Sequence, residues 1–418
     1  MIHDARAVLG SWYAAAVAAV QGEHVLPEHA RVVGEEWIFE RPGRILRFTL
    51  PRDGGRLRII GLGKASLGMA RGFRRSLQRA GRDIDEGLLI VRDAPSESVA
   101  REPWNIVRGD HPYPGEASLQ AARRVIDFIG TPDRRDGFVV LLSGGASALC
   151  ALPAPGVTLE EKRRVTSELM HAGASIAELN RVRKQLSAIK GGRLADRIAP
   201  ASLVTLAISD VPGDDPDIIG SAPTWTADRA TRGEVRYAVI ATLDDALDGA
   251  TRAARTAGHE VRRLGRYLDG SVEQVADRIH DELAKLRART PADRSCVLIA
   301  GGESLVTVRG RGRGGRAQEL AVRLSRALAD SGGEARWQGL VGLVAGTDGS
   351  DGPTAAAGGF FDAKGLERAQ AAEVDLADAL HQNDCFTALS RLGDVFITGP
   401  TGTNVADVLI AMIPGRLE

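Results

Sequence analysis

The chain has little cysteine, no excess of charge of either sign and no long apolar run. Its three cysteines, Cys150, Cys296 and Cys385, lie far apart without metal-ligand spacing, which argues against a disulfide framework and favours a reducing, cytoplasmic location. Lys plus Arg and Asp plus Glu number 54 each, so no net field draws the protein to nucleic acid or to a membrane surface. No run is long and apolar enough to span a bilayer.

The remaining composition is typical of a soluble globular enzyme, with 418 residues, 44% apolar and 26% charged, which suits two domains. The uncharged, alanine-rich segment 7–20 is expected to be an opening helix, because Leu9, Tyr13 and Val17 recur on one side; a signal peptide is the alternative. The 49 glycines cluster in loops after apolar runs, as expected where backbone approaches a ligand.

Short apolar runs recur along the chain, each followed by a glycine-rich turn and then a helical pattern. This alternation predicts an α/β domain with a largely parallel sheet, whose ligands bind at the carboxyl ends of the strands. After a polar stretch at residues 228–236 the alternation resumes, so we expect domains at residues 1–232 and 233–418, with the last strand or helix able to pack back on the first domain. Strands are predicted at residues 57–60, 87–91, 138–142 and 203–208, and in the second domain at 238–241, 296–300, 340–345 and 394–398.

The loop after the run 340–345 holds two carboxylates, Asp348 and Asp351, among glycines and hydroxyls that include Thr347. A strand that delivers acids onto a glycine loop is a common way to build a site for a metal and phosphates. Together with similar loops elsewhere, residues 346–354 therefore indicate phosphoryl transfer.

Residues 61–64, Gly-Leu-Gly-Lys, follow a predicted strand and open a helix. Backbone N–H groups at a helix start attract anions, and Lys64 adds a point charge. The segment is not a Walker A loop, because Arg58 occupies the place of the first glycine, and Ser66 replaces the third glycine of a dinucleotide fingerprint. A tight strand–helix turn with a solvated lysine is the structural alternative.

Two further loops of the first domain follow strands. Residues 143–147, Ser-Gly-Gly-Ala-Ser, let backbone amides and hydroxyls face a phosphate, and they lack the spacing of a nucleophile elbow. Asp210, directly after the run 203–208, is well placed as a metal ligand or as a base for a substrate hydroxyl. Plain turn chemistry is the alternative for both loops.

Basic residues near position 180 are candidates for anion binding. Residues 180–190 are expected to be helical, with Arg181 and Lys184 on a shared face and Lys190 before two glycines. Arg181 and Lys184 could clamp a carboxylate or a phosphate, although a solvated basic face explains them almost as well. His111 follows a short apolar run and is the histidine best placed for a site, but a lone histidine is more often structural.

Three loops of the second domain repeat the pattern. Glu303 lies in Gly-Gly-Glu-Ser after the run 296–300. Arg316 begins a helix after an arginine–glycine stretch, where it could stabilise the charge of a transferring phosphoryl group. Residues 398–404, Thr-Gly-Pro-Thr-Gly-Thr-Asn, form the last such loop, with Asp407 behind it. A purely structural origin for all of these loops is the weaker explanation.

Ten short motifs run in order over nearly the whole chain. They are residues 61–64, 109–112, 143–148, 180–184, 190–192, 209–214, 301–303, 315–319, 346–354 and 398–404. In these motifs the chain resembles the class II glycerate kinases, the glycerate 2-kinase type with a MOFRL domain, formerly described as hydroxypyruvate reductases. The pattern departs at Ala222, Ala317 and Ala355, where the family usually has Gly, Asn and Asp.

The resemblance implies an ATP-dependent kinase that acts on D-glycerate with Mg²⁺ and gives 2-phosphoglycerate. It also implies a cleft between an N-terminal Rossmann-like domain and a smaller C-terminal α/β MOFRL domain, and a need for Lys64 and Arg316, which with Asp210 are the catalytic candidates. Candidate metal ligands are Asp210, Glu303, Asp348 and Asp351. Candidate substrate- or nucleotide-binding residues are Gly61, Gly63, His111, Ser143, Gly144, Gly145, Ser147, Arg181, Lys184, Lys190, Glu303, Gly315, Gln318, Thr347, Thr401 and Asn404.

Three other functions stay open. A nicotinamide-dependent hydroxypyruvate reductase requires a dinucleotide fingerprint, which is broken here at Ser66. A kinase for another small hydroxy acid fits the same motifs. A non-catalytic nucleotide-binding regulator would tolerate loss of the acids, which are all present. We expect small-molecule substrates as partners, neither nucleic acid nor membrane, and a monomer or homodimer.

Overall fold

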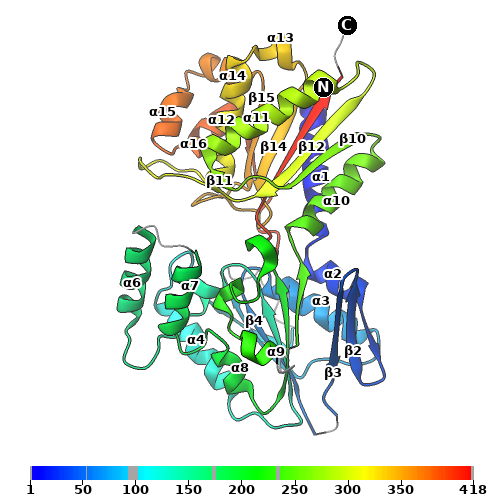
Figure 1. Cartoon of the computed structure of the whole chain (residues 1–418), viewed down its shortest axis with the longest axis vertical. Helices are drawn as coiled ribbons and strands as arrows, with labels where there is room; N and C mark the ends of the chain where they lie inside the picture. Colours follow the sequence, from blue (N-terminus) through cyan, green and yellow to red (C-terminus); the bar gives the residue numbers. More distant parts are fainter. Residues whose placement is uncertain (1, 53, 93–101, 172–175, 232–235, 416–418) are drawn as a thin grey trace. The chain divides into compact units, whose positions relative to one another are not determined.

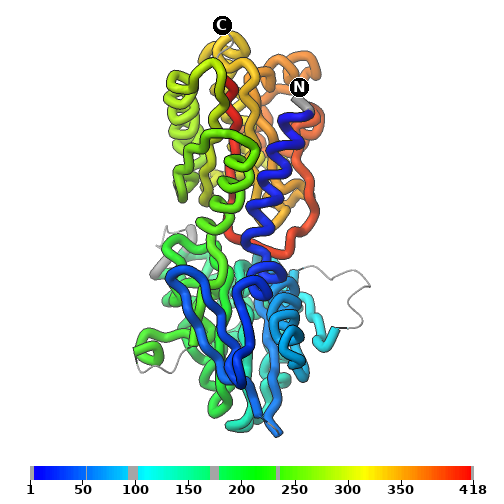
Figure 2. Tube along the Cα trace, turned by 90° about the vertical axis from the view of Figure 1, so that its right-hand side faces the viewer, coloured from blue at the N-terminus to red at the C-terminus, as the bar shows by residue number. Residues whose placement is uncertain are grey.

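The computed structural model describes residues 2–52, 54–92, 102–171, 176–231 and 236–415, and the chain divides into two compact units (Figure 1). The parallel-sheet unit contains residues 20–242 and 402–404, and the mixed-sheet unit contains residues 1–19, 243–401 and 405–418. The opening helix α1 (Ile2–Ala18) therefore belongs with the C-terminal half, and Figure 2 shows it, in blue, among green-to-red segments. Across the described ranges, no helix is both long and apolar enough to cross a membrane.

Six parallel strands form the sheet of the parallel-sheet unit, in the order β6-β5-β4-β7-β8-β9. Renumbered from β4, this is the doubly wound order 3-2-1-4-5-6 of dinucleotide-binding folds, so the predicted Rossmann-like sheet is confirmed. The strands β4 and β7 are buried along their whole length, which explains why each is a continuous apolar run.

The strands of this sheet are β4 (Leu57–Leu62), β5 (Glu86–Val91), β6 (Trp104–Arg108), β7 (Gly137–Leu142), β8 (Ser202–Ile208) and β9 (Arg236–Ala241). The helices of the unit are α2 (Gly22–His29), α3 (Ser66–Gln78), α4 (Glu116–Ile129), α5 (Ala146–Leu149), α6 (Leu159–His171), α7 (Ile176–Gln185), α8 (Arg193–Ile198) and α9 (Ala227–Thr231), with 3₁₀ turns at Pro212–Asp214 and Ile219–Ser221.

A three-stranded antiparallel sheet precedes the parallel sheet and was not predicted. Its middle strand β2 (Glu36–Arg41) pairs with β1 (Ala30–Val33) and β3 (Arg44–Thr49). Trp37 of β2 is buried; its indole Nε1 donates to Ser76 Oγ of α3 at 2.8 Å, and its ring centroid lies 5.0 Å from that of Phe73. The small sheet is thus fastened to α3, the helix that the turn at Lys64 opens.

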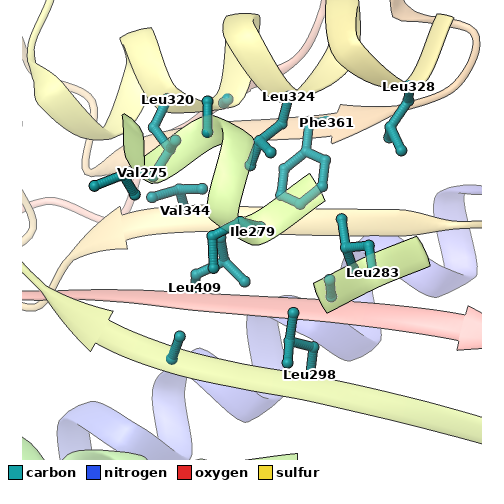
Figure 3. Close-up of a cluster of buried hydrophobic side chains, with 14 of the residues drawn as sticks. Val275, Ile279, Leu283, Leu298, Leu320, Leu324, Leu328, Val344, Phe361 and Leu409 are labelled. Carbon is teal, nitrogen blue, oxygen red and sulfur yellow. The ribbon is translucent and has the colours of Figure 1, made fainter. Parts of the chain in front are cut away.

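The mixed-sheet unit is built on six strands in the order β10-β12-β17-β14-β15-β16, of which only β10 and β12 are parallel neighbours. Helices α1 and α10 contact each other and the sheet. Figure 3 shows the core between the sheet and helices α11 and α12, where Ile279, Leu324 and Phe361 are buried side by side.

The strands of this unit are β10 (Glu260–Arg266), β11 (Gly270–Ser271), β12 (Ser295–Gly302), β13 (Ser304–Leu305), β14 (Val341–Gly346), β15 (Gly358–Asp362), β16 (Val395–Phe396) and β17 (Asp407–Pro414). Its remaining helices are α10 (Leu243–Thr256), α11 (Val272–Arg289), α12 (Arg316–Asp330), α13 (Gly333–Trp337), α14 (Gly365–Ala371), α15 (Leu376–His381) and α16 (Cys385–Leu392).

The structure also differs from the sequence-based expectation in other elements. The unpredicted strand β17 lies between β12 and β14 and makes the sheet mixed. The strand β9, expected in the second domain, pairs with β8 at the edge of the first sheet. The strand predicted at 394–398 is reduced to Val395–Phe396, and the helix predicted at 180–190 ends at Gln185.

A closed ring of four charged side chains fastens α1 within the mixed-sheet unit. Arg6 of α1 donates to Asp394 at 2.6 Å and to Asp362 at 3.3 Å, and Arg368 donates to each of these carboxylates at 2.8 Å. The side chains of Asp362 and Asp394 are only 4% and 2% exposed, so both anionic charges depend on the two arginines. The opening helix is therefore held by buried ion pairs as well as by apolar packing.

Replacing Asp394 with Asn should lower the free energy of unfolding of the mixed-sheet unit by about 3 kcal/mol, because Arg6 and Arg368 lose a shared buried anion. Urea unfolding measures this change. The exposed Asp330 on α12 supplies the control, since Asp330→Asn should shift the free energy by less than about 0.5 kcal/mol. Equal midpoints for wild type and the Asp394 variant would contradict the stabilising role of the ring.

Candidate active site

Two glycine loops interlock where the order of the parallel sheet reverses, at the carboxyl ends of β4 and β7. The backbone N–H of Lys64 donates to the carbonyl oxygen of Gly144 at 3.0 Å, and that of Ala65 donates to Ser143 Oγ at 3.0 Å. Gly63 has a φ of +125°, and a Cβ there would lie 2.3 Å from Ser143 Oγ. This is the switch point at which doubly wound sheets bind their ligands. The structure thus joins two loops that the sequence predicted separately.

Gly144 lies directly beneath a pair of polar side chains. The Nδ2 of Asn404 donates to Asp210 Oδ2 at 2.7 Å, and a Cβ on Gly144 would lie 2.2 Å from that oxygen and 2.3 Å from the nitrogen. Asp210 follows β8, whereas Asn404 belongs to residues 402–404, which return to this unit from the far end of the chain. The predicted residues Gly144, Asp210 and Asn404 therefore form one cluster.

Ser147 connects the second glycine loop to a group of polar neighbours. Lys190 Nζ donates to the carbonyl oxygen of Ser147 at 3.0 Å and contacts its hydroxyl. The hydroxyls of Ser147 and Ser221 are 2.9 Å apart, and Ser221 donates to Asn180 Oδ1 at 3.3 Å. Ser147 and Lys190 were predicted as site residues, whereas the polar roles of Ser221 and Asn180 have no local signal in the sequence.

The other candidates of this unit are placed around the same loops. Arg181 is exposed, and Lys184 forms an ion pair with Asp217 at 2.5 Å. The imidazole of His111 lies beside the second loop, since a Cβ on Gly145 would be 3.3 Å from its Cδ2. His111 is thus brought to the site by the fold, while the charge of Lys184 is already engaged.

Arg316, at the start of α12 in the mixed-sheet unit, is held by two carboxylates. Its guanidinium donates to Asp407 at 2.6 and 3.1 Å and to Glu303 at 2.6 Å. Burial opposes the positive charge, but Asp407 and Glu303 outweigh it and raise the pKa of Arg316 above its usual value. The sequence analysis noted Asp407 only as a residue that follows the loop 398–404. No local pattern indicates its contact with Arg316, which lies 91 positions earlier.

Asp351 caps α12 rather than facing solvent. Its carboxylate accepts from the backbone N–H groups of Ala317 and Gln318 at 3.1 and 2.8 Å and from Gln318 Nε2 at 2.9 Å. A Cβ on Gly315 would lie 2.2 Å from Asp351 Oδ1, so glycine is needed for this approach. Burial and then repulsion from Asp407 raise the pKa of Asp351 to about 7, although the hydrogen bonds from Gln318 and Ala317 oppose the rise.

The loop after β14 is fixed by hydroxyl groups. Thr401 Oγ1 donates to the carbonyl oxygen of Thr347 at 2.5 Å, and the Thr401 N–H donates to the carbonyl oxygen of Asp348 at 3.3 Å. The hydroxyl of Tyr13 on α1 donates to the carbonyl oxygen of Gly346 at 2.7 Å. Thr347 and Thr401 thus contact each other, and these hydrogen bonds hold the loop backbone in place.

The candidate metal ligands belong to both units, Asp210 to the parallel-sheet unit and Glu303, Asp348 and Asp351 to the mixed-sheet unit. In the part of the chain that the structure describes, no group of three or more His, Cys, Asp or Glu side chains could hold a metal by itself. Mg²⁺ needs only one or two carboxylates where phosphates and water complete its shell. Asp210, beside the glycine loops, fits that pattern best, and Asp351, already bound by three N–H donors, fits it least.

The fold and the loops at the switch point define a two-unit α/β protein with a site suited to phosphorylated ligands. A family model described as a domain of unknown function, DUF4147, matches residues 8–253, and the MOFRL family model matches residues 296–407. The chain therefore belongs to the DUF4147–MOFRL family, the family of the class II glycerate kinases, which confirms the resemblance of the motifs.

Individual relatives agree with this assignment. A D-glycerate 2-kinase from Thermotoga maritima is 36% identical over 403 residues, which cover 89% of this chain and 94% of the relative. A protein of Agrobacterium vitis with the provisional name hydroxypyruvate reductase is also 36% identical, covering 86% of this chain and 100% of its own length. The crystal structure of a glycerate kinase from Thermotoga maritima superposes with a TM-score of 0.76 at 30% identity, covering 98% of this chain and 100% of that one.

Gly144→Ala should lower turnover by about two orders of magnitude, because the added methyl group displaces Asp210 and Asn404 by about 1 Å or more. Steady-state kinetics of the phosphoryl transfer proposed below measures the loss, and circular dichroism checks that the fold is kept. Gly10→Ala is the control, on helix α1, where the added Cβ would meet only Phe396, at 3.7 Å, which is an ordinary van der Waals contact. Full activity in the Gly144 variant would contradict the importance of this cluster.

The pH dependence of stability should carry the signature of Asp351. Its pKa rises from 3.8 in the unfolded chain to about 7, so the folded protein holds a proton between these pH values that the unfolded chain has lost. The stability of wild type relative to Asp351→Asn should therefore fall by about 2 kcal/mol from pH 5 to pH 8. Urea unfolding at both pH values tests this, and a difference that does not change with pH would contradict it.

Proposed function

We propose that this chain is an ATP-dependent glycerate kinase, which transfers the γ-phosphoryl group of ATP to the 2-hydroxyl of D-glycerate. The observation that carries the proposal is the pair of interlocked glycine loops at the switch point, with Lys64 and Asp210 beside them, in a chain of the glycerate kinase family. Phosphoryl transfer needs positioning and charge stabilisation more than covalent chemistry by the protein, and such loops supply both.

In the parallel-sheet unit, the backbone N–H groups around Gly63 and Gly144 and the ammonium group of Lys64 would bind the phosphates. Asp210 would accept the proton of the attacking hydroxyl or hold the metal. During transfer the substrate oxygen bonds to the γ-phosphorus while the bond to the bridging oxygen of ADP breaks, so charge moves onto the ADP phosphates. Lys64 is a group of the right charge to stabilise it.

In the mixed-sheet unit, Arg316 would stabilise the charge of the transferring group, with Asp407 and Glu303 holding its guanidinium in a fixed orientation. Arg316 begins α12, whose start is capped by Asp351, so the position of the guanidinium depends on a buried cap rather than on a mobile loop. Thr347 and Asp348, in the loop after β14, and Thr401, which bonds to that loop, stay candidates for ligand contacts.

Magnesium is the cofactor that this chemistry calls for, since it would neutralise charge on the β- and γ-phosphates. Asp210 is the residue we propose as its protein ligand, with phosphate oxygens and water as the others. Glu303 is a second candidate, although it is engaged with Arg316 at 2.6 Å.

A nicotinamide-dependent reductase is the second candidate, because the strand order of the parallel sheet is that of dinucleotide-binding folds. The turn itself argues against it. Ser66 stands where the fingerprint has its third glycine, and its hydroxyl donates to the carbonyl oxygen of Gly63 at 2.8 Å. Gly61 is needed for packing, since a Cβ there would lie 2.6 Å from Leu89 and 2.8 Å from Ser66. Parallel assays with glycerate and Mg-ATP, and with hydroxypyruvate and NADH, separate the two functions.

Lys64→Met and Arg316→Gln should each lower kcat by about a thousandfold, because each removes a positive charge that stabilises the transferring phosphoryl group. ADP formation in a coupled assay with D-glycerate measures this. Lys285→Met is the matched control, since Lys285 is 60% exposed on α11 and forms an ion pair with the nearby Glu282. Near-normal rates in both site variants would refute the assigned roles.

A further inference from the structure

Three basic side chains gather behind the second glycine loop, in the parallel-sheet unit. Lys162 on α6 and Lys190 after α7 are each 3% exposed, and Arg183 on α7 is half-buried. Lys162 Nζ has no hydrogen-bond partner within the described part of the chain. Among the residues that the structure describes, the thiol of Cys150 also borders the cluster, and it is neutral because burial raises its pKa to about 12.

The charge of this cluster is physically unusual. The partly buried cations Arg6 and Arg316 of the mixed-sheet unit lie against carboxylates. Here burial first, and repulsion from Lys162 and Arg183 second, lower the pKa of Lys190 well below its usual value. Burial likewise lowers the pKa of Lys162 to about 8, so near neutral pH most of its population is still charged. Buried ammonium groups without an anion are unfavourable, and an anion that enters the cluster relieves that cost.

The cluster is joined to the candidate active site by Lys190. Its side-chain Nζ donates to the carbonyl oxygen of Ser147 at 3.0 Å, and Ser147 is the last residue of the loop that contains Gly144. On the same side, the hydroxyls of Ser147 and Ser221 and the side-chain amide of Asn180 form a chain of polar groups. An acid bound among the cations would place its own hydroxyl groups within reach of these neutral partners.

The basic residues that the sequence singled out are less suited to a carboxylate. Lys184 already has an anionic partner in Asp217, at 2.5 Å, and Arg181 is exposed to solvent, where an ion pair contributes little. Lys162, Arg183 and Lys190 of the buried cluster are therefore better suited than Arg181 and Lys184 to bind the carboxylate of a small acid.

We propose that Lys162, Arg183 and Lys190 form the subsite for the carboxylate of the acceptor substrate, a small hydroxy acid, with Ser147, Ser221 and Asn180 facing its hydroxyl groups. The identity of the acceptor as glycerate rests on the proposed function, whereas the binding of a small carboxylate at this cluster does not. In the proposed function ATP is bound by Lys64 and by backbone N–H groups of the glycine loops, so a change at Lys162 or Arg183 should leave the KM for ATP unaltered.

The test is Lys162→Met, which removes the unpaired charge at similar volume. Without ligand, the variant should be at least as stable as wild type in a thermal unfolding experiment. The reason is that the substitution removes a buried positive charge for which the wild-type cluster supplies no anion. Its KM for D-glycerate should rise at least about tenfold, the loss of a charged hydrogen bond, while its KM for ATP stays within about twofold. Arg163→Met, on an exposed position of the same helix, is the control and should change neither constant.

A pH series gives a second readout. The KM of wild type for D-glycerate should rise between pH 7 and pH 9, as Lys162 loses its proton near pH 8 beside Lys190, Arg183 and Cys150, and this dependence should be absent in Lys162→Met. Arg183→Gln should show the same selective rise in the glycerate KM, and it keeps the proposal testable if the Lys162 variant does not fold.

Thermal shifts with D-glycerate, lactate and inorganic phosphate, each without ATP, separate this proposal from the proposed function. Stabilisation of wild type by the two carboxylates, lost in Lys162→Met, supports the subsite even if glycerate is not phosphorylated. An unchanged glycerate KM in both variants, a parallel rise in the ATP KM, a loss of stability in Lys162→Met without ligand, or stabilisation by phosphate alone would each overturn it.

Discussion

The close approach of two backbone turns at the switch point of the parallel sheet is the constraint on which the site depends. The turn at Gly63 can approach the loop at Gly144 only because Gly63 has no side chain, since a Cβ there would lie 2.3 Å from Ser143 Oγ. Gly144 must lack a side chain for a different reason, because its Cβ would lie 2.2 Å from Asp210 Oδ2. The approach of the two turns places Lys64 beside Gly144 and leaves Gly144 in contact with Asp210 and Asn404. Three strands and the returning residues 402–404 therefore deliver their functional groups to a single place in the unit.

The parallel sheet could be predicted from the sequence because its inner strands β5, β4, β7 and β8 are almost wholly buried and form continuous apolar runs. The mixed sheet was harder. Its central strand β17 is also a short apolar run, which periodicity alone cannot distinguish from a buried helical segment. The strand β9 was recognised as a strand, but its sheet was misjudged, because pairing with β8 is a long-range property that no local pattern encodes. The strands β1 to β3 were not predicted, because they are short and none of them is a continuous apolar run.

Most loops of the candidate site could be predicted from the sequence, but the contacts between residues of different loops could not. Asp210 and Asn404 were both predicted, yet nothing in the sequence indicates that residues 194 positions apart share a hydrogen bond. The acid Asp351 illustrates the limit of residue type as a guide, because a carboxylate in a glycine loop can hold a metal or cap a helix. In this structure its carboxylate accepts three N–H groups and caps α12. The sequence did not indicate this capping contact, because Asp351 is far along the chain from Arg316, where the helix begins.

The two units treat buried charge in different ways, and the difference points to function. In the mixed-sheet unit, the partly buried Arg6, Arg368 and Arg316 are each paired with two carboxylates, so the protein itself supplies the opposite charge and fixes the orientation of each guanidinium. In the parallel-sheet unit, Lys162 and Lys190 are more deeply buried, but their neighbours are a thiol and a serine instead. A folded protein retains such an imbalance at a cost in stability. This cost has a functional explanation if a substrate brings the missing negative charge. Binding of the anion then relieves the unfavourable burial of positive charge, and that free energy contributes to substrate affinity.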